Sequence, residues 1–541
     1  MKRLVPVAFA LTIALAASRS AFFLANAAVL YGDPLEAFYL ESKFVHLCWR
    51  AQAGEALYPD YRIEPHVANF FSPLYFLLVG GLGRLADADL DALTRIGRLG
   101  SVGPSLAAAL VVGLASGRRY GRRAGVLSGL IGLSSAPLMP FGAMARPDLL
   151  ADTLGFAGFL AAISARPRRQ WIGAALLGAA ILTKQTSGVY LLAASAGLLA
   201  SGRWKASAAV GLGPLLAVGA IVGVATVRDG PMFVLSLLGE REMGWDPVFW
   251  VMANRAIVER APELPYFAAV GLVLWVARRP REPALAALAV LVPAAAVVTS
   301  AKIGSDLNYF LGLRLVSAMG AGAAWGAELR RPEGGEQGGP ARPRPRPRWG
   351  WLAVALVGTL AMVPGLRDAA RVFGESRAEA RFYSSDRGRA VLEAYRLFFD
   401  LAEDPDRPIL TDSGPILLRM RGRAPFADPW LFRSLAIDGR LRPDDLRRRV
   451  VRGEFEAVIS TGDLRAPIAL NHQFLLPPGL IVPVRASYLP AFAIDPGDDR
   501  HALYVDLPRV RVGPPPPQVV AASRLAPRTV DPGPGPGEEG R

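Results

Sequence analysis

The sequence predicts an all-α polytopic membrane domain followed by a small α/β domain. Of the 541 residues, 52% are hydrophobic, and the mean hydropathy is +0.29. The apolar residues come in blocks of about fifteen to twenty, the length that a helix needs to cross the hydrocarbon core of a bilayer. From about residue 367 these blocks stop and short strand-like runs begin. A helix satisfies the hydrogen-bonding groups of its own backbone in lipid, so the apolar blocks are interpreted as membrane helices.

The first apolar block covers residues 4–30 and follows the basic pair Lys2 and Arg3. A cleaved signal peptide is one interpretation, but the length of the block favours an uncleaved first helix. Because lysine and arginine are enriched in cytoplasmic loops, we place the N-terminus in the cytoplasm. Arg19 lies inside this helix, where an unpaired charge is costly, so we expect a polar group of a neighbouring helix to contact it.

Residues 31–97 form the predicted first outer loop. The loop contains an amphipathic helix near 34–53, whose Glu41 and Lys43 are interpreted as exposed, and a short apolar piece near 70–86. That piece begins with a proline and contains three glycines, which favours a re-entrant or surface-lying helix. If it crossed the membrane, the arginine-rich "GRRYGRR" that ends the next span would lie outside, against the charge bias.

The remaining spans alternate under the same rule. They are predicted at 98–116, 124–143, 149–164, 171–183, 187–201, 206–227, 264–277, 283–300, 308–327 and 350–366. With the first helix this makes about eleven spans in a membrane domain of residues 1–366, with the C-terminal region outside. Residues 328–349 are rich in proline, arginine and glycine and predict a flexible cytoplasmic loop that touches anionic lipid.

The C-terminal part predicts a small extracytoplasmic α/β domain over residues 367–511. An amphipathic helix pattern covers 376–403, and strand-like runs occur at "PILTD", "FEAVIS" and "HALYVDL". The segment 512–541 is dominated by proline and glycine and predicts a disordered tail.

Charge and cysteine usage exclude several classes of function. The formal net charge is +15, but the basic residues cluster in short loops and form no stripe interleaved with aromatics, so nucleic acid is not an expected partner. Cys48 is the single cysteine, which excludes an intrachain disulfide and a cysteine-based metal site. No phosphate-loop, HExxH or CxxC motif is present. No cofactor is predicted with certainty, and a divalent metal stays open.

Four polar clusters share the outer face in this topology, although they were not used to build it. They are Asp33 with Glu36, Arg146 with Asp148, Lys184 with Gln185, and Lys302 with Asp306 and Asn308. Taken singly, each has a structural explanation as a helix cap or a snorkelling lysine. Ionisable groups at membrane depth usually face a cavity or each other. Their co-location therefore favours one site, suited to a lipid-linked phosphate beside a group that accepts a proton.

The same residues carry a family resemblance. An apolar first helix followed by "GDPLEAFY", "AGEALYPDY" and "NFFSPLYFLL" resembles the start of a GT-C glycosyltransferase of the protein O-mannosyltransferase and aminoarabinose-transferase type. "ARPDLLADTLGF", "ILTKQTSG" and "AKIGSDLNYFL" fit later landmarks of bacterial relatives, over about residues 1–366. The C-terminal "ILTDSGPILLRMRGRAPFADP" and "GEFEAVIS" are similar to the tail of some bacterial members.

The resemblance implies a reaction and its residues. Such enzymes transfer a sugar, with inversion, from a polyprenyl-phosphate donor to a lipid, glycan or protein acceptor outside the cytoplasmic membrane. Asp33 matches their catalytic carboxylate, with Glu36 as a second catalytic candidate, and Lys184 matches a lysine near the donor phosphate. The expected substrate-binding residues are Arg146, Asp148, Lys184, Gln185, Lys302, Asp306, Asn308 and Tyr309, with His66 and Tyr75 of the first outer loop.

Two other functions stay open from the sequence. A transporter would show internal repeats and polar sites near mid-membrane, whereas the polar clusters here lie at one boundary and no repeat is seen. A non-catalytic relative that only binds lipid-linked sugar is the other alternative. It is favoured by Gly312, because relatives often have a glutamate at this position.

Overall fold

The computed structural model describes residues 4–36, 41–239, 244–277, 282–302, 306–329, 348–465, 476–494, 502–509 and 514–525. The chain divides into two compact units. The membrane unit comprises residues 1–32, 51–55 and 70–377, and the sheet unit comprises residues 33–50, 56–69 and 378–541. The sequence prediction differs from this division, because it assigned all of 31–97 to the membrane domain.

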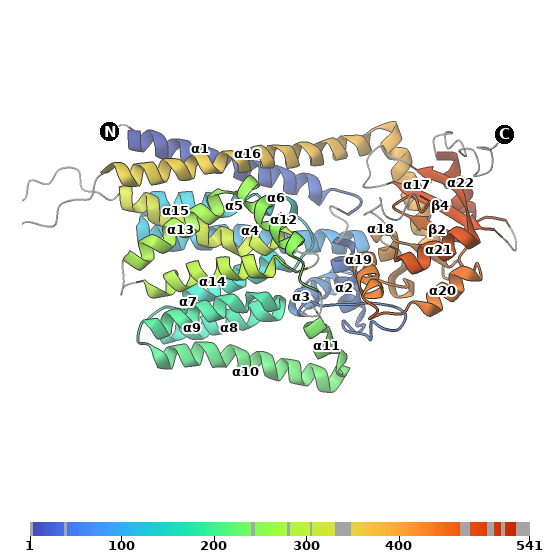
Figure 1. Cartoon of the computed structure of the whole chain (residues 1–541), viewed down its shortest axis with the longest axis horizontal. Coiled ribbons are helices and arrows are strands. Elements are labelled where there is room, and N and C mark those ends of the chain that lie inside the picture. Colours follow the sequence, from blue (N-terminus) through green and yellow to red (C-terminus); the bar gives the residue numbers. More distant parts are fainter. Residues whose placement is uncertain are drawn as a thin grey trace, which may run out of the picture. The chain divides into compact units, whose positions relative to one another are not determined.

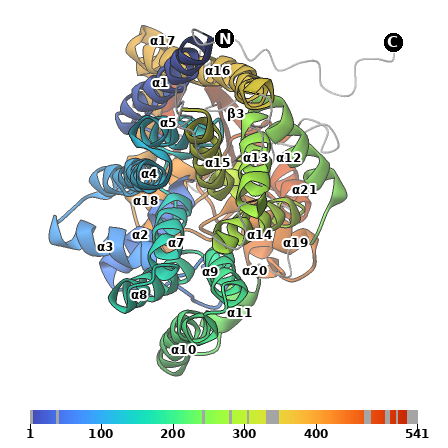
Figure 2. The same ribbon diagram turned by 90° about the vertical axis from the view of Figure 1, so that its left-hand side faces the viewer.

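The described part of the membrane unit is helical (Figures 1 and 2). Its helices are α1 (Leu4–Tyr31), α3 (Leu74–Leu85), α4 (Leu90–Tyr120), α5 (Arg122–Leu133), α6 (Leu138–Phe141), α7 (Asp148–Ala162), α8 (Pro167–Thr183), α9 (Gly188–Ala200), α10 (Trp204–Asp229), α11 (Met232–Gly239), α12 (Pro247–Arg260), α13 (Glu263–Ala277), α14 (Pro283–Thr299), α15 (Leu311–Leu329) and α16 (Arg348–Ser384), with the 3₁₀ helices η1 (Gln185–Ser187) and η3 (Leu307–Phe310). Most of these helices are seen from the side in Figure 1 and nearly end-on in Figure 2.

Length and composition make several of these helices suited to a bilayer. Among the described residues, α1, α4 and the Trp204–Val227 part of α10 are long and apolar enough to cross a membrane, and α3, α13 and α14 are shorter apolar helices. Large apolar side chains on α4 and α10 point outward: Leu110 is 62% exposed and Leu216 is 72% exposed. Such surfaces are unfavourable in water and favourable in lipid, which fits a multi-pass membrane protein.

Helix α3 is shorter than a full membrane span. Its 12 residues extend about 18 Å at 1.5 Å per residue, against a hydrocarbon core of about 30 Å. Helix α5, in a segment predicted to cross, also has 12 residues, so it stays a prediction that the piece near 70–86 lies on or re-enters the membrane.

A buried ion pair ties α1 to its neighbours. The Arg19 guanidinium lies 2.5 Å from the Glu263 carboxylate on α13, and both side chains are almost completely buried. Arg19 also donates to the Met362 carbonyl oxygen of α16, and the hydroxyls of Thr12 and Thr359 lie 2.7 Å apart. Helices α1 and α16 therefore lie side by side, as both views show (Figures 1 and 2). The predicted partner for Arg19 is confirmed.

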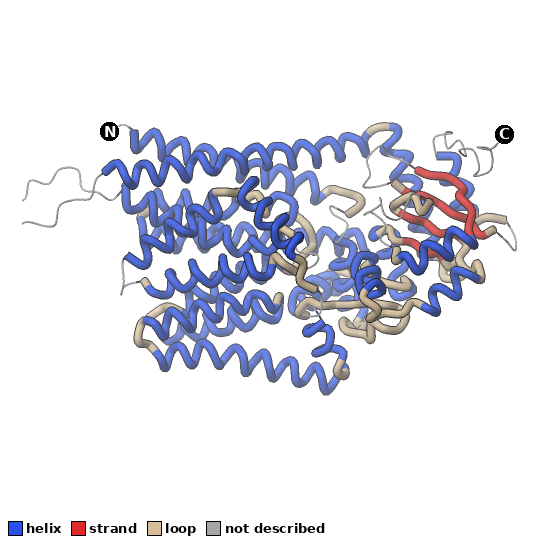
Figure 3. The backbone as a smooth tube through the Cα atoms, in the orientation of Figure 1, coloured by secondary structure: helices blue, strands red, loops and turns tan. Residues whose placement is uncertain are grey.

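The sheet unit contains a four-stranded sheet (Figure 3). Its strands are β1 (Ile409–Thr411), β2 (Ala457–Ser460), β3 (Tyr488–Ile494) and β4 (Leu503–Pro508). The order is β1-β2-β4-β3; β1 and β2 are parallel, whereas β4 runs antiparallel to both β2 and β3. Its helices are α2 (Glu41–Ala53), which belongs to this unit up to Arg50, α17 (Asp386–Glu403), α18 (Gly414–Met420), η4 (Arg421–Arg423), α19 (Pro429–Ile437), α20 (Asp444–Val451), α21 (Pro478–Ser487) and α22 (Pro517–Leu525).

Three of the four strands are those that the sequence predicts. The additional strand β3 contains Pro490, which cannot donate to a ladder and so weakens the strand signal. Proline is tolerated at a sheet edge, and β3 is an edge strand whose register shifts between Pro490 and Phe492.

Two predicted boundaries differ from the structure. The helix expected to end at 366 continues to Ser384 and is 37 residues long, and Ser385 then caps α17 by accepting from the Gly388 N–H. Within the predicted disordered tail, residues 517–525 form α22, which packs on α17. The rest of the tail from 526, and residues 330–347 of the predicted basic loop, lie outside the described residues.

The predicted exposure of Glu41 and Lys43 is wrong. Glu41 is 1% and Lys43 is 8% exposed, because α2 is buried within the sheet unit on its polar as well as its apolar side. The Lys43 ammonium lies 2.5 Å from the Asp428 carboxylate. The sequence pattern of an amphipathic helix is real, but the polar face packs against charged groups of the C-terminal region instead of water.

Candidate functional site

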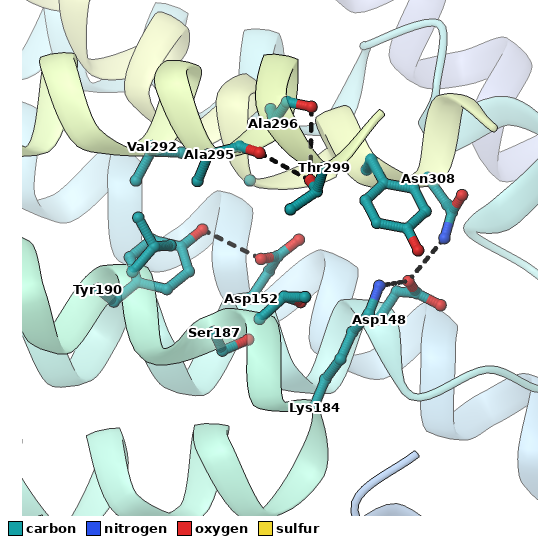
Figure 4. A pocket seen from close by; sticks show the side chains of 14 residues that line it. Asp148, Asp152, Lys184, Ser187, Tyr190, Val292, Ala295, Ala296, Thr299 and Asn308 are labelled. Carbon is teal, nitrogen blue, oxygen red and sulfur yellow. Dashed lines mark hydrogen bonds and ion pairs between the residues drawn. The ribbon is translucent and has the colours of Figure 1, made fainter. Parts of the chain in front are cut away.

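A cavity of about 110 Å³ lies inside the membrane unit where several helix ends meet. It is lined by the N-terminal ends of α7, α9 and α15, by the C-terminal half of α14 and by residues that follow α8. Figure 4 shows its lining side chains. The residues that line the cavity are Asp148, Asp152, Lys184, Thr186, Ser187, Val189, Tyr190, Val292, Ala295, Ala296, Thr299, Asn308, Tyr309 and Gly312.

Asp148 is the centre of the polar wall. It is the first residue of α7, where a carboxylate is favoured by the helix dipole. Its Oδ1 lies 2.5 Å from the Lys184 Nζ and 3.0 Å from the Asn308 Nδ2, and its Oδ2 lies 3.0 Å from the Arg146 Nε. Because all these donors engage it and its side chain is 2% exposed, Asp148 is an anchor for two cations.

Local structure explains how the two cations reach Asp148. Lys184 follows the last residue of α8 in an extended conformation, with φ −155°, so that its side chain turns back toward the start of α7. Its Nζ lies 4.9 Å from the centre of the Tyr309 ring. The Arg146 guanidinium lies 5.0 Å from the centre of the Phe141 ring. Aromatic faces attract cations at such distances, so both charges are held in place on two sides.

Asp152 is a cavity residue that the sequence analysis missed. It lies one helical turn after Asp148 on α7 and accepts a hydrogen bond from the Tyr190 hydroxyl at 3.1 Å (Figure 4). The i, i+4 spacing of the two aspartates in "ARPDLLADTLGF" puts them on one helix face, and this was the available signal.

Gly312 faces the same two groups. A Cβ atom at this position would lie 2.7 Å from the Tyr190 hydroxyl and 3.2 Å from the Asp152 Oδ1. A side chain at Gly312 would therefore displace the Tyr190 hydroxyl. The Asp152 carboxylate of α7 nevertheless lies beside this position.

A further buried cation lies close to the cavity. Arg314 is completely buried, and its guanidinium donates to the carbonyl oxygens of Leu311 and Gly132. Among the described residues its Nη2 has no hydrogen-bond partner, and its charge attracts Asp152. Two buried cations, Lys184 and Arg314, therefore lie in or near the cavity wall, and such cations suit a bound anion.

Other predicted residues of the membrane unit do not line the cavity. The Gln185 amide donates to the Phe70 carbonyl oxygen at 2.7 Å and accepts from the Ser72 hydroxyl. Tyr75 is completely buried, and its hydroxyl donates to the Gly97 carbonyl oxygen at 3.0 Å. These contacts connect the 70–75 segment to its neighbours.

Lys302 and Asp306 also lie outside the cavity lining. The backbone of Lys302 forms an isolated β-bridge with Trp245. Asp306 caps η3 by accepting from the Leu307 N–H at 2.6 Å. This part of the chain therefore contributes to the cavity through Asn308 and Tyr309.

Asp33 and Glu36 belong to the sheet unit. The half-buried Asp33 carboxylate accepts from the Leu35 N–H at 3.0 Å. Glu36 accepts from the Ser42 N–H at 3.1 Å. Its Oε1 would lie 2.7 Å from a Cβ atom on Gly414, so this carboxylate rests directly on the first residue of α18. The loop that carries Asp33 is thus attached to the C-terminal region.

His66 belongs to the sheet unit as well. Its backbone N–H donates to the Pro425 carbonyl oxygen at 2.9 Å, and its Nδ1 lies 3.0 Å from the Tyr61 carbonyl oxygen. Burial lowers the pKa of this imidazole. Within the described part of the chain, no group of three or more histidine, cysteine, aspartate or glutamate side chains is arranged to hold a metal ion.

The fold was compared with known proteins. No family model and no curated protein matches the sequence. ArnT from Cupriavidus metallidurans bound to undecaprenyl phosphate is similar in structure, with a TM-score of 0.55 and 17% identity over 91% of this chain and 99% of that chain. The apo state of the same protein has a TM-score of 0.52 and 16% identity, over 90% of this chain and 97% of that chain. The apo form of the Archaeoglobus fulgidus oligosaccharyltransferase has a TM-score of 0.50 and 11% identity, over 90% of this chain and 73% of that chain. The chain therefore has the fold of GT-C glycosyltransferases, as the sequence resemblance implies.

Proposed function

We propose that this protein is an integral membrane glycosyltransferase that moves a sugar from a polyprenyl-phosphate donor to an acceptor. The single observation that carries the proposal is the placement of two buried cations, Lys184 and Arg314, at the Asp148 cavity. The fold supports it, because one structure with this fold was solved with undecaprenyl phosphate. Under this proposal the protein is in the cytoplasmic (inner) membrane and acts at its outer face in glycosylation of the cell envelope.

Lys184 is the proposed contact for the donor phosphate. When the bond between the sugar C1 and the phosphate oxygen breaks, negative charge increases on the phosphate. A cation that is already positioned stabilises that charge without reorganisation. Asp148 and Tyr309 hold Lys184 in one place, so little conformational entropy is lost when the donor binds.

Asp33 is the proposed general base. It accepts the proton of the acceptor hydroxyl while that oxygen attacks the sugar C1 from the face opposite the phosphate, which inverts the anomeric carbon. Phosphate is already a good leaving group, so a strong acid is not required. Glu36 supports the loop of Asp33 through Ser42 and the start of α18.

Substitution of Asp33 tests the proposed function. Asp33→Asn keeps the size of the side chain and its ability to accept from the Leu35 N–H, but it removes the base. Loss of a general base costs roughly 10²–10⁴-fold in rate, so transfer should fall by this factor while the donor still binds. Retention of more than about a tenth of the activity, well above that range, would place the base elsewhere.

The proposed orientation is tested separately. Residues 118–123 should be cytoplasmic and residue 450 should be outside, because arginine-rich loops stay in the cytoplasm. Reporter fusions at 120 and 450 should therefore report opposite sides. The same side for both would contradict the topology and leave the chemistry of the cavity untouched.

A further inference from the structure

A second cavity in the membrane unit, far along the same helices, has a different character. It has a volume of about 630 Å³ and lies between the C-terminal parts of α4 and α7. Its lining is Val111, Leu114, Ala115, Arg118, Arg119, Ala157, Leu160, Ala161, Ile163, Ser164 and Arg169. We call it the arginine groove, and we propose that it binds one anionic phospholipid.

The first argument is the gradient of polarity along the groove. Val111, Leu114, Ala115 and Arg118 are spaced i, i+3, i+4 and i+7, so they share one face of α4. On α7, Ala157, Leu160 and Ala161 form the opposite wall. Over the seven residues from Val111 to Arg118, about 10 Å at 1.5 Å per residue, the groove changes from apolar to cationic. A phospholipid has the same sequence of an apolar chain and a charged phosphate.

The second argument is charge complementarity. Within the described part of the chain, no hydrogen bond or ion pair engages the guanidinium groups of Arg118, Arg119 and Arg169. The adjoining segments 117–123 and 163–170 contain seven arginines and no acidic residue. An anion is thus the ligand that these side chains lack. Arginine suits phosphate, because its planar guanidinium binds two oxygens at once.

The third argument is that the backbone next to the groove needs no ligand. Arg203 donates to the carbonyl oxygens of Ile163 and Ser164, at 2.9 and 2.6 Å. The loop after α7 is therefore fixed from its other side. The groove keeps its shape and leaves the three lining arginines available.

The experiment measures lipid retention by the full-length protein. The protein is delipidated in detergent and mixed with phosphatidylglycerol or phosphatidylcholine of identical acyl chains, and bound lipid is counted by native mass spectrometry. We expect retention of phosphatidylglycerol over phosphatidylcholine. Each basic residue near a lipid surface is worth about 1 kcal/mol, or about fivefold, so Arg118→Gln/Arg119→Gln/Arg169→Gln should weaken retention on the order of a hundredfold.

Two controls separate a site from general charge. Arg122→Gln/Arg166→Gln/Arg168→Gln removes the same charge from neighbouring arginines that do not line the groove, and it should keep the preference. Ala161→Phe fills the apolar wall and should reduce retention although all arginines remain. Melting temperatures show that each variant is folded.

Several outcomes would overturn the proposal. Equal retention of the two phospholipids by the wild type would show that no anionic site exists. An equal loss in both triple variants would show a diffuse charge effect. Binding of undecaprenyl phosphate in place of phosphatidylglycerol would assign the groove to a carrier lipid. Displacement of bound phosphatidylglycerol by millimolar inorganic phosphate would show that the apolar wall contributes nothing to binding. None of these results depends on whether Asp33 is the base.

Discussion

Asp148 and Asp428 are two buried carboxylates that each hold a lysine at 2.5 Å, yet their surroundings differ. Asp148 lies in the membrane unit, binds a second cation and lines a cavity. Asp428 lies in the sheet unit, where it binds Lys43 and caps α19 by accepting from the Leu431 N–H at 3.0 Å. The first carboxylate therefore holds two cations at a cavity, whereas the second holds one cation and caps a helix. Under the proposed function the first pair receives a ligand, and the second joins two distant parts of the chain.

Removing each carboxylate should produce the largest effects. Asp148→Ala and Asp428→Ala each take a carboxylate away from a buried cation, and breaking a buried pair in this way costs about 3–5 kcal/mol of stability. Lys43→Met/Asp428→Leu should restore the melting temperature, because apolar replacement of a buried pair is often neutral. Lys184→Met/Asp148→Leu should restore stability only in part, because buried Arg146 also loses the Asp148 carboxylate, and it should not restore donor binding. Normal donor affinity in Lys184→Met/Asp148→Leu would show that the Lys184–Asp148 pair, like the Lys43–Asp428 pair, is only structural.

Lys184 alone sharpens the comparison. A hydrogen bond to a charged group is worth about 1.5–3 kcal/mol, so Lys184→Gln should weaken donor binding about 10- to 150-fold. The exposed Lys205→Gln is the matched control and should bind donor like the wild type. Binding is measured by titration with a polyprenyl-phosphate sugar. Equal affinities for both variants would make Lys184 a structural lysine.

Two glycines rest against carboxylates, one in each unit. Gly312→Ala brings a Cβ within 2.7 Å of the Tyr190 hydroxyl, and Gly414→Ala brings one within 2.7 Å of the Glu36 Oε1. Overpacking costs about 1–3 kcal/mol. We expect Gly312→Ala to raise KM for the donor and to be rescued by Tyr190→Phe.

Gly414→Ala should instead lower kcat with little change in donor KM, because it displaces the loop of Asp33. Steady-state kinetics with varied donor distinguish the two. A kcat defect from Gly312→Ala together with a KM defect from Gly414→Ala would reverse the assignment of the units.

The smallest effect is a pH dependence of the sheet unit. Burial, with a contribution from Arg50, lowers the pKa of His46 to about 3, below the unfolded value of about 6.5. Between these values the unfolded chain binds a proton that the folded chain does not, so stability falls as pH decreases, by up to about 1.4 kcal/mol per pH unit. His46→Gln should flatten the change of melting temperature between pH 6.5 and 4. An unchanged slope would show that other groups dominate.

The sequence predicted a helical membrane unit and a small sheet domain, because hydropathy and strand patterns are local signals. The number of spans and their orientation stay predictions. Co-location of Arg146, Asp148, Lys184 and Asn308 followed from placing each cluster on one face, and the structure brings these residues into contact. The roles of these residues remain proposals. Asp152 was missed, because it lies inside a predicted span and only its spacing from Asp148 marks it.

The first outer loop was harder to predict. Its Glu41 and Lys43 have the pattern of a solvent-facing helix, and no local signal distinguishes water from a distant protein partner. The contact with Asp428 joins residues 385 positions apart, and such pairing depends on tertiary packing. The same limit applies to Gly414, whose neighbour Glu36 lies at the other end of the chain.

The separation of Lys43 from Asp428 has a consequence for synthesis. Translation proceeds at about 5–20 residues per second, so the 385 positions that separate them take roughly 20–80 s to make. Helix α2, with its charged groups and its apolar Phe44 and Leu47, leaves the ribosome long before the region that buries it. During that interval the nascent chain exposes a surface that is buried in the folded protein, which a holding chaperone would recognise. A chain that terminates before residue 428 would keep that surface and be a target for quality-control proteolysis.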